Sequence, residues 1–266
     1  MSELLTLVEL GRVEYGRALV LQERLVELRR TGAIGDALLL LEHPPVLTLG
    51  RNAGRENIVA TDAELAARGV AVHVVKRGGD VTYHGPGQLV GYPVMDLREL
   101  RVESGARMGV VDFVRRLEEV LIRVAGEFGV RAGRVAGRTG VWTAPVSGSS
   151  PGTPPGSLTA ERKLAAIGVH VSRGVTSHGF ALNVSTDLRD FGWIVPCGIA
   201  DRAVTSLAEE AEGGERLTVG GVGQATARAF GRVFGRQVLA VDGPEAVHAS
   251  FQGWTQDGMR DWEDNG

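Results

Sequence analysis

The stretch that most constrains the fold runs from Arg77 to Gln88 and reads RGGDVTYHGPGQ. Valine-rich apolar runs of strand length flank it at residues 70–75 and 89–95, so the pattern predicts a strand, a loop and a second strand. Glycine lets backbone N–H groups approach a ligand closely, and a hairpin connection usually needs only about 2–5 residues. A loop of this length and polarity therefore indicates a binding loop rather than a simple turn.

Composition is typical of a soluble globular protein, with 43% hydrophobic and 23% charged residues in a chain of 266. No apolar run approaches the ~20 residues of a membrane span, and the N-terminus lacks the basic-then-apolar order of a signal peptide. The single cysteine excludes an internal disulfide and fits a reducing compartment. We therefore expect a cytoplasmic protein that binds no membrane.

Charge divides the chain into two parts. Residues 242–266 hold six acids and one base, which leaves residues 1–241 at +2 within a net charge of −3. Neither part has the basic clustering of a nucleic-acid binder. We expect a single domain over residues 1–241, followed by an acidic C-terminal tail over residues 242–266. Residues 145–157 are rich in Pro, Gly and Ser and predict a flexible insertion.

Hydrophobic spacing predicts short strands interleaved with a few helices. We expect strands at residues 4–10, 37–41, 140–143, 163–171, 177–184 and 237–241, and helices at residues 15–30, 61–68, 110–128 and 223–234. The strands at 163–171 and 177–184 should pair as a hairpin around Arg173-Gly174, and residues 195–199 should form a turn. On the helix at 110–128, we expect Arg115, Arg116, Glu118 and Glu119 to face outward. This order favours an α+β, or mixed α/β, fold.

Four motifs in the order RGGDVTYHGPGQLVGYPV, KLAAIGVHVS, SHGFALNV and IVPCGI closely resemble the lipoyl(octanoyl) transferases. The earlier segment EHPPVLTLGR, residues 42–51, also resembles that family. The resemblance runs from about Leu4 to about Phe234, and the insertion and the acidic tail lie outside the family pattern. It implies the fold of the biotin and lipoate protein ligases: a mixed sheet flanked by helices, with a smaller C-terminal subdomain from about residue 185.

The resemblance also implies an activity, in which an octanoyl group moves from octanoyl-acyl carrier protein to a lysine of lipoyl domains. The acceptors would be the lipoyl domains of 2-oxoacid dehydrogenase E2 subunits and the glycine cleavage H protein, and no cofactor or metal is implied. By the same resemblance, Cys197 is the acyl-thioester nucleophile and Lys163 its activating partner. The implied substrate cradle comprises Arg77, Gly78, Gly79, Asp80, Val81, Thr82, Tyr83, His84, Ala166, Ile167, Gly168, Gly179, Phe180 and Ala181.

The implied chemistry agrees with the residue types. A free thiol has a pKa near ~8.5 and needs a neighbouring cation or base at neutral pH. Lys163 could act as an ammonium that favours the thiolate or as a neutral amine that accepts the proton. His84 is the one histidine that we expect in the site, because it lies inside the binding loop. His43, His73, His170 and His178 show no metal-ligand spacing, and we expect them to be structural or loop residues. Nine arginines between Arg98 and Arg138 suggest a docking face for an acidic carrier protein.

The sequence is compatible with two other functions. The first is an ATP-dependent lipoate- or biotin-type protein ligase, which would adenylate a free acid and need no cysteine, although the chain has no P-loop motif. The second is a non-catalytic module that binds an acyl group or a lipoyl domain. Dependence on ATP separates the first from an octanoyltransferase, and the absence of catalysis separates the second.

Overall fold

The computed structural model describes residues 4–143, 161–195 and 204–242. Within these residues the largest element is an eight-stranded mixed sheet of order β11-β1-β2-β6-β10-β9-β8-β7. Its strands are β1 (Leu4–Arg12), β2 (Asp36–Glu42), β6 (Gln88–Val94), β7 (Ala132–Val135), β8 (Arg138–Thr143), β9 (Lys163–Ser172), β10 (Val175–Asn183) and β11 (Gln237–Asp242). Strand β1 pairs in parallel with β2 and β11, and the other pairs are antiparallel.

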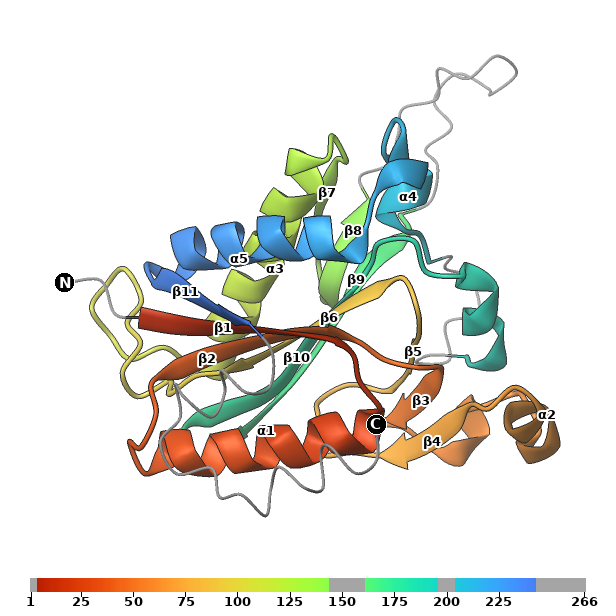
Figure 1. Cartoon of the computed structure of the whole chain (residues 1–266), viewed down its shortest axis with the longest axis horizontal. Coiled ribbons are helices and arrows are strands. Elements are labelled where there is room, and N and C mark those ends of the chain that lie inside the picture. The colour runs from red at the N-terminus through yellow and green to blue at the C-terminus, as the bar shows by residue number, and fades with distance from the viewer. Residues whose placement is uncertain (1–3, 144–160, 196–203, 243–266) are drawn as a thin grey trace.

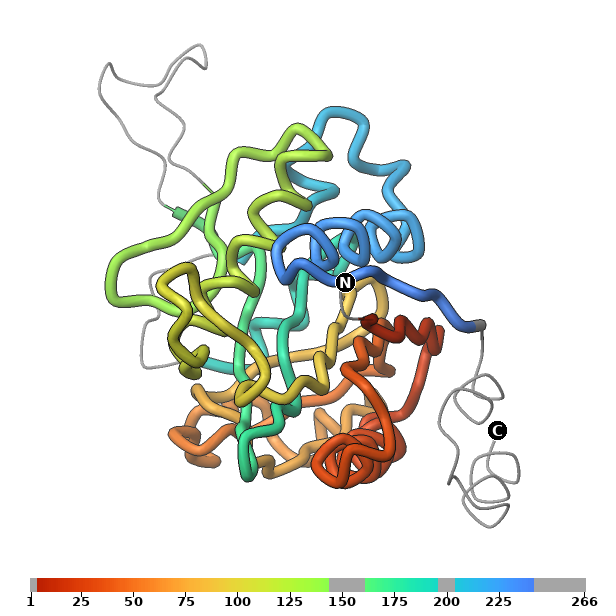
Figure 2. Tube along the Cα trace, turned by 90° about the vertical axis from the view of Figure 1, so that its left-hand side faces the viewer, coloured from red at the N-terminus to blue at the C-terminus, as the bar shows by residue number. Residues whose placement is uncertain are grey.

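Helices cover both faces of this sheet. Helix α1 (Tyr15–Arg30) packs on one face, and α3 (Val110–Glu127) and α5 (Val219–Phe234) pack together on the other (Figure 1). In the turned view of Figure 2 the strands run between α1 below and α5 above. The four consecutive leucines of β2 are buried on both faces of the sheet. Leu38 and Leu40 lie in the core beneath α3 and α5, while Leu39 and Leu41 lie in the core beneath α1. A strand buried on both faces has no polar side to display.

A second, three-stranded sheet of order β4-β3-β5 lies beside the first. Its strands are β3 (Val46–Leu49), β4 (Ala71–Val74) and β5 (Val81–His84). Helix α2 (Asp62–Ala67), predicted at residues 61–68, begins at a capping box formed by Thr61 and Glu64. Strand β5 corrects the prediction of one continuous loop over residues 77–88. Val81 and Tyr83 alternate with Thr82 and are buried in the small core of this sheet, because VTYH pairs antiparallel with β3.

Several predicted elements are confirmed. Helix α1 has the predicted bounds, and β9 and β10 pair as a hairpin whose two-residue turn, Arg173-Gly174, has φ values of 50° and 92°. Helix α5 begins four residues before the prediction, at Val219, because the Thr218 side chain caps it by accepting a hydrogen bond from Gly221 N (3.2 Å). Strand β7 was not predicted. The remaining elements are α4 (Leu207–Glu210) and three short 3-10 segments at Arg55–Asn57, Leu188–Trp193 and Gly214–Arg216.

The prediction that Glu118 faces outward on α3 is wrong. The Glu118 side chain is fully buried, and its carboxylate contacts Arg115 Nη1 (2.6 Å) and Arg134 Nε (3.0 Å). It also accepts a hydrogen bond from Gly140 N at 3.2 Å. Arg134 and Gly140 belong to β7 and β8, so the unpredicted β7–β8 hairpin is what covers this turn of the helix.

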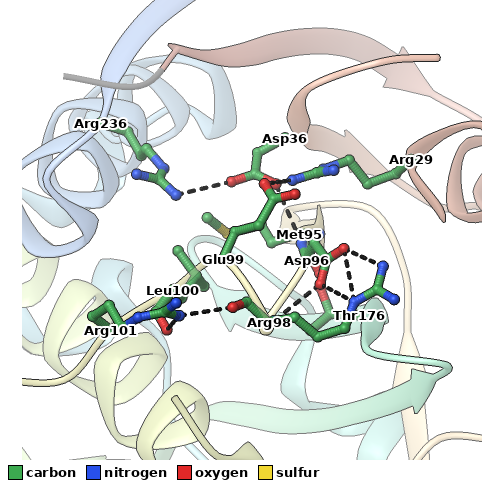
Figure 3. Close-up of polar contacts among 10 residues, drawn as sticks. All are labelled: Arg29, Asp36, Met95, Asp96, Arg98, Glu99, Leu100, Arg101, Thr176 and Arg236. Atoms are coloured by element: carbon green, nitrogen blue, oxygen red, sulfur yellow. Dashed lines mark hydrogen bonds and ion pairs between the residues drawn. The ribbon is translucent and has the colours of Figure 1, made fainter. Parts of the chain in front are cut away.

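A buried ion cluster joins the ends of four elements (Figure 3). Asp36, at the start of β2, accepts hydrogen bonds from Arg29 Nε on α1 (2.8 Å) and from Arg236 Nη2, which lies between α5 and β11 (3.2 Å). Arg29 also pairs with Glu99, and the backbone N of Asp96 donates to Asp36 at 3.2 Å. The cluster thus ties the C-terminal elements to the main sheet, which β11 extends. A smaller subdomain from about residue 185 stays a prediction.

The expected insertion at 145–157 lies outside the described residues, as do nearly all of the tail at 242–266 and most of the turn at 195–199. Among the described residues, no helix is both long enough and apolar enough to span a membrane.

Candidate active site

A cavity of about 550 Å³ lies where the loop before β5 meets strands β8, β9 and β10. All but two of the fourteen predicted cradle residues line it, and Lys163 lines it as well. Three motifs that are far apart in the sequence therefore share one wall. Additional lining residues that the sequence did not assign to the cradle include Tyr15, Asn52, Tyr92, Arg138, Trp142 and His178.

The two predicted residues outside the wall are Gly78 and Tyr83. Gly78 donates its N–H to Val169 O (3.0 Å) and so attaches the loop to β9. A Cβ on Gly168 would lie 2.7 Å from Gly78 O, so only a glycine allows this approach. Tyr83 points into the small core, and its hydroxyl donates to Asp190 at 2.7 Å. Alternation along β5 explains this, since His84 and Thr82 face the cavity and Tyr83 faces away.

Arg77 supplies a buried cation at the cavity wall. It is 7% exposed, and its guanidinium donates to Thr48 O (2.7 Å), Thr48 Oγ1 (2.8 Å) and Gly78 O (3.1 Å). Burial lowers the pKa of Arg77, but a guanidinium stays protonated in proteins. Its positive charge therefore faces a ligand space while carbonyl and hydroxyl oxygens hold its position.

Histidine and tyrosine side chains gather beneath this wall. His43 Nε2 lies 2.7 Å from the Tyr92 hydroxyl, and His43 Nδ1 lies 2.6 Å from Val13 O. His84 Nδ1 lies 2.7 Å from Gln88 Oε1, and its ring stacks on Tyr15 with centroids 6.1 Å apart. Sequence reasoning selected only His84 from this cluster. The others come from α1, from the turn after β2 and from β6, and no local motif connects them.

Burial keeps these histidines uncharged near neutral pH. It lowers the pKa of His43 and of His178 to about 4, and that of His84 to about 3. His178 lines the cavity with a left-handed backbone (φ 55°), and its buried Nδ1 has no hydrogen-bond partner among the described residues. The sequence analysis set His178 aside, and its position in the wall is a finding of the structure.

Lys163 begins β9 and is half-buried in the cavity wall, with its Nζ 5.0 Å from the centroid of the Trp142 ring. Cys197 lies outside the described residues. On its N-terminal side, Val195 N donates to Asn57 O (2.8 Å), and on its C-terminal side Thr205 N donates to Lys163 O (2.9 Å). Val204 forms a parallel bridge with Lys163 and also lines the cavity. The chain after Cys197 therefore returns beside Lys163.

Among the described residues, no group of three or more His, Cys, Asp or Glu side chains is arranged to hold a metal ion. The polar groups of the wall include the guanidiniums of Arg77 and Arg138, Lys163, neutral imidazoles and the carboxylate of Asp80, which accepts hydrogen bonds from Asn57 Nδ2 and Val81 N (2.6 Å each). Such a wall suits an uncharged polar group, such as a carbonyl, together with an apolar chain against Ile167 and Phe180.

Comparison with known proteins gives the family. The model of the lipoyl protein ligase A/B catalytic domain matches residues 14–231. An octanoyltransferase of Acidobacterium capsulatum is 60% identical over 242 residues, which cover 90% of this chain and 94% of that protein. An octanoyltransferase of Koribacter versatilis is 52% identical over 236 residues, covering 89% and 86%.

Solved structures agree at the level of the fold. A bi-partite lipoate protein ligase from Thermoplasma acidophilum superposes with a TM-score of 0.64 at 17% identity, covering 95% of this chain and 91% of that one. Lipoate-bound LipL1 of P. falciparum gives a TM-score of 0.65 at 12% identity, covering 96% and 70%. The predicted fold class is thereby confirmed. From the family model and the close relatives together, the chain belongs to the lipoyl protein ligase A/B catalytic domain family and, within it, to the octanoyltransferases.

Proposed function

We propose that this octanoyltransferase takes its acyl group from octanoyl-acyl carrier protein and delivers it to a lysine of lipoyl domains through a thioester on Cys197. The acceptors would be the lipoyl domains of 2-oxoacid dehydrogenase E2 subunits and of the glycine cleavage H protein. The catalytic unit would be residues 1–241, working in the cytoplasm without a cofactor. The relatives' names support octanoyl transfer, and the donor, the acceptors and the residue roles are our own assignment.

One observation carries the residue roles: Lys163 lies in the wall of the cavity together with most of the predicted cradle, and the chain that follows Cys197 pairs with Lys163 itself. Cys197 is also the only cysteine of the chain. A thiol nucleophile in this family therefore has one candidate, and its segment ends at the wall where an acyl chain would lie.

The reaction would proceed in two half-reactions at one sulfur. In the first, the Cys197 thiolate attacks the octanoyl carbonyl carbon, the bond to the carrier sulfur breaks, and the carrier thiol leaves with a proton. In the second, the neutral amine of the acceptor lysine attacks the carbonyl carbon of the new thioester and the bond to the Cys197 sulfur breaks. An amide forms, its nitrogen loses a proton to solvent, and the Cys197 thiolate is released. Exchange between thioesters is nearly balanced and amide formation is downhill, so no nucleotide is needed. Lys163 would favour the thiolate as an ammonium or accept its proton as an amine.

Positive charge near the cavity mouth supports an acidic donor, and it includes two cations besides the nine arginines that the sequence suggested. Among those nine, Arg98, Arg115, Arg123 and Arg134 pair with acids of this chain. The loops beside the cavity (the rim) add Arg51 and Lys76, both exposed and neither in an ion pair among the described residues. We therefore place donor docking at the loops that hold these two side chains.

Backbone hydrogen bonds connect this rim to the cavity. Arg51 N donates to Arg77 O (3.1 Å), and the adjacent Asn52, which lines the cavity, donates its N–H to Gly79 O (3.1 Å). Burial, and after it the charges of Arg51 and Lys76, lower the pKa of His170 on β9. The positive charges of Arg51 and Lys76 thus act on the same histidine of β9.

Intact-protein mass spectrometry tests the proposal directly. After mixing with octanoyl-acyl carrier protein without nucleotide or acceptor, we expect one octanoyl group on the enzyme, removable by neutral hydroxylamine as a thioester. Cys197→Ala should show no acyl-enzyme and no transfer. Lys163→Ala should acylate about 10²–10⁴-fold more slowly at pH 7 and recover partly toward pH 8.5. Near-normal transfer by Cys197→Ala would contradict the thioester mechanism, and a requirement for ATP would favour an ATP-dependent lipoate- or biotin-type protein ligase.

A further inference from the structure

The pairing of β8 with β9 shifts by one residue at the cavity. Val141 pairs with Ala165, but the next residue, Trp142, pairs with Lys163. Without the shift Trp142 would oppose Leu164, which is fully buried in the main core. Opposed residues of an antiparallel pair project from the same face, and bulges of this kind redirect side chains near active sites. The shift therefore brings the Trp142 ring and the Lys163 side chain together on the cavity wall.

The contact has the geometry of a cation–π interaction. Lys163 Nζ lies 5.0 Å from the centroid of the Trp142 ring, within the ~6 Å over which such attraction operates. Trp142 is only 6% exposed, and its buried Nε1 has no hydrogen-bond partner in the described part of the chain. The indole is thus held by packing and by the cations near its ring, of which Arg138 is the second at 5.7 Å.

A buried support fixes this part of β8. Gly140 has a φ of 122°, and a Cβ there would lie 2.6 Å from Ala165 O and 3.3 Å from Lys163 Cε. Its N–H donates to the buried carboxylate of Glu118 on α3 (3.2 Å). The glycine leaves room for the stem of Lys163, and Glu118 holds the strand in place. The position of Lys163 is therefore determined by the β8–β9 pairing and by helix α3, which packs behind it.

We propose that Trp142 is a positioning residue for Lys163: its ring face holds the Nζ ammonium at the cavity wall for the first half-reaction. This inference rests on the proposed role of Lys163. The ring quadrupole attracts a cation and not a neutral amine. Of the two roles that the sequence left open for Lys163, the contact therefore selects the ammonium, which favours the thiolate electrostatically.

Single-turnover acylation tests this with two variants at Trp142. At saturating octanoyl-acyl carrier protein and pH 7, Trp142→Leu should form acyl-enzyme about 5- to 30-fold more slowly, the rate equivalent of 1–2 kcal/mol. Trp142→Phe keeps an aromatic face and should lose only about 2- to 5-fold. The KM for the donor should change less than the rate, and the loss should shrink as pH rises toward 8.5, where solvent generates the thiolate.

A double variant separates positioning from mere packing. If Trp142 acts through Lys163, Trp142→Leu in a Lys163→Ala background should cost no further rate. The same comparison with Trp142→Phe keeps the test usable if the leucine variant does not fold. Phe234→Leu is the matched control, because Phe234 is also a buried aromatic with an arginine, Arg116, 5.9 Å from its ring centroid, but it lies on α5 away from the cavity. It should acylate at the parental rate.

Two results would overturn the inference while leaving the proposed function intact. One is a Trp142→Leu enzyme with the parental rate and pH profile while Lys163→Ala is slow. The other is an equal fold-loss from Trp142→Leu with and without Lys163, which would make the indole part of the cavity wall only. A normal rate in Lys163→Ala would instead remove the lysine's role and the inference with it.

Discussion

At the scale of single residues, three histidines in and beneath the cavity wall are held neutral by burial. The unfolded chain leaves a histidine with a pKa near ~6.5, whereas burial lowers the pKa of His43 and His178 to about 4 and that of His84 to about 3. Between these values the unfolded chain binds more protons than the folded chain. The free energy of unfolding must therefore fall as the pH falls from about 6.5 toward 4.

We predict that His43→Gln flattens this pH dependence. The variant removes one group that must be neutral in the fold, so its loss of unfolding free energy between pH 7.5 and pH 5 should be smaller than the parental loss by about 1–2 kcal/mol. Urea unfolding followed by circular dichroism at both pH values measures the difference. The variant itself should be less stable at pH 7.5, because the contact with Tyr92 is changed. Only the change in unfolding free energy between the two pH values tests whether His43 is neutral in the fold. Equal slopes would show that His43 takes up its proton as readily in the folded chain as in the unfolded chain.

The cradle could be predicted from the sequence, whereas the cluster of His43, Tyr92 and Tyr15 could not. The resemblance to the lipoyl(octanoyl) transferases identified the cradle, because its members lie within short motifs, whereas glycine content and polarity indicated only a binding loop at residues 77–88. His43 and Tyr92 meet only because β2 pairs with β6, where Leu39 lies opposite Tyr92, and Tyr15 reaches them from the first turn of α1. A contact made by strand pairing across fifty residues leaves no local signal, so this layer of the site required the structure.

At the scale of elements, two predictions were wrong, the continuous loop over residues 77–88 and the outward-facing Glu118, because each depends on contacts with segments that are distant in the sequence. Strand β5 is only four residues long between glycine-rich turns, so the glycines concealed its alternation. Glu118 occupies a helix position where a carboxylate is usually solvated, and it became buried because β7 and β8 fold over it. The long amphipathic helices and apolar strands were predictable because one periodic signal spans several turns or residues.

Removing the Glu118 carboxylate should loosen the β7–β8 hairpin from α3. Glu118→Leu leaves the Gly140 N–H without its acceptor and separates Arg115 and Arg134 from their shared partner, so we expect a loss of about 2–3 kcal/mol in unfolding free energy. The arginines are half-exposed and regain water, which keeps the loss below that of a fully buried pair. Glu119→Leu is the control on the adjacent, partly exposed residue and should cost under about 1 kcal/mol. Equal losses in the two variants would contradict this account.

At the scale of the whole molecule, the cavity joins the two sheets, and the rim cations lie where the loops of the small sheet meet β9. Four of the nine arginines between Arg98 and Arg138 are already matched by acids of this chain, namely Arg98, Arg115, Arg123 and Arg134. Arg51 and Lys76 are exposed and have no acid partner among the described residues, so we expect an acidic partner to gain binding energy there. Attraction between exposed charges is screened over about 10 Å at 0.1 M salt, so this docking should weaken as salt rises.

Reversing both rim charges tests the docking face. Arg51→Glu/Lys76→Glu should raise the KM for octanoyl-acyl carrier protein about tenfold or more at low salt, and the difference from the parent should shrink at high salt. The neutral thioester octanoyl-N-acetylcysteamine has no carrier to dock, so its KM should change much less. Arg228→Glu/Arg232→Glu applies the same charge change to exposed residues of α5 and should leave both values near the parental ones. If the rim variant lost affinity for both donors equally, the two cations would serve the cavity itself; if it lost none, the carrier would dock elsewhere.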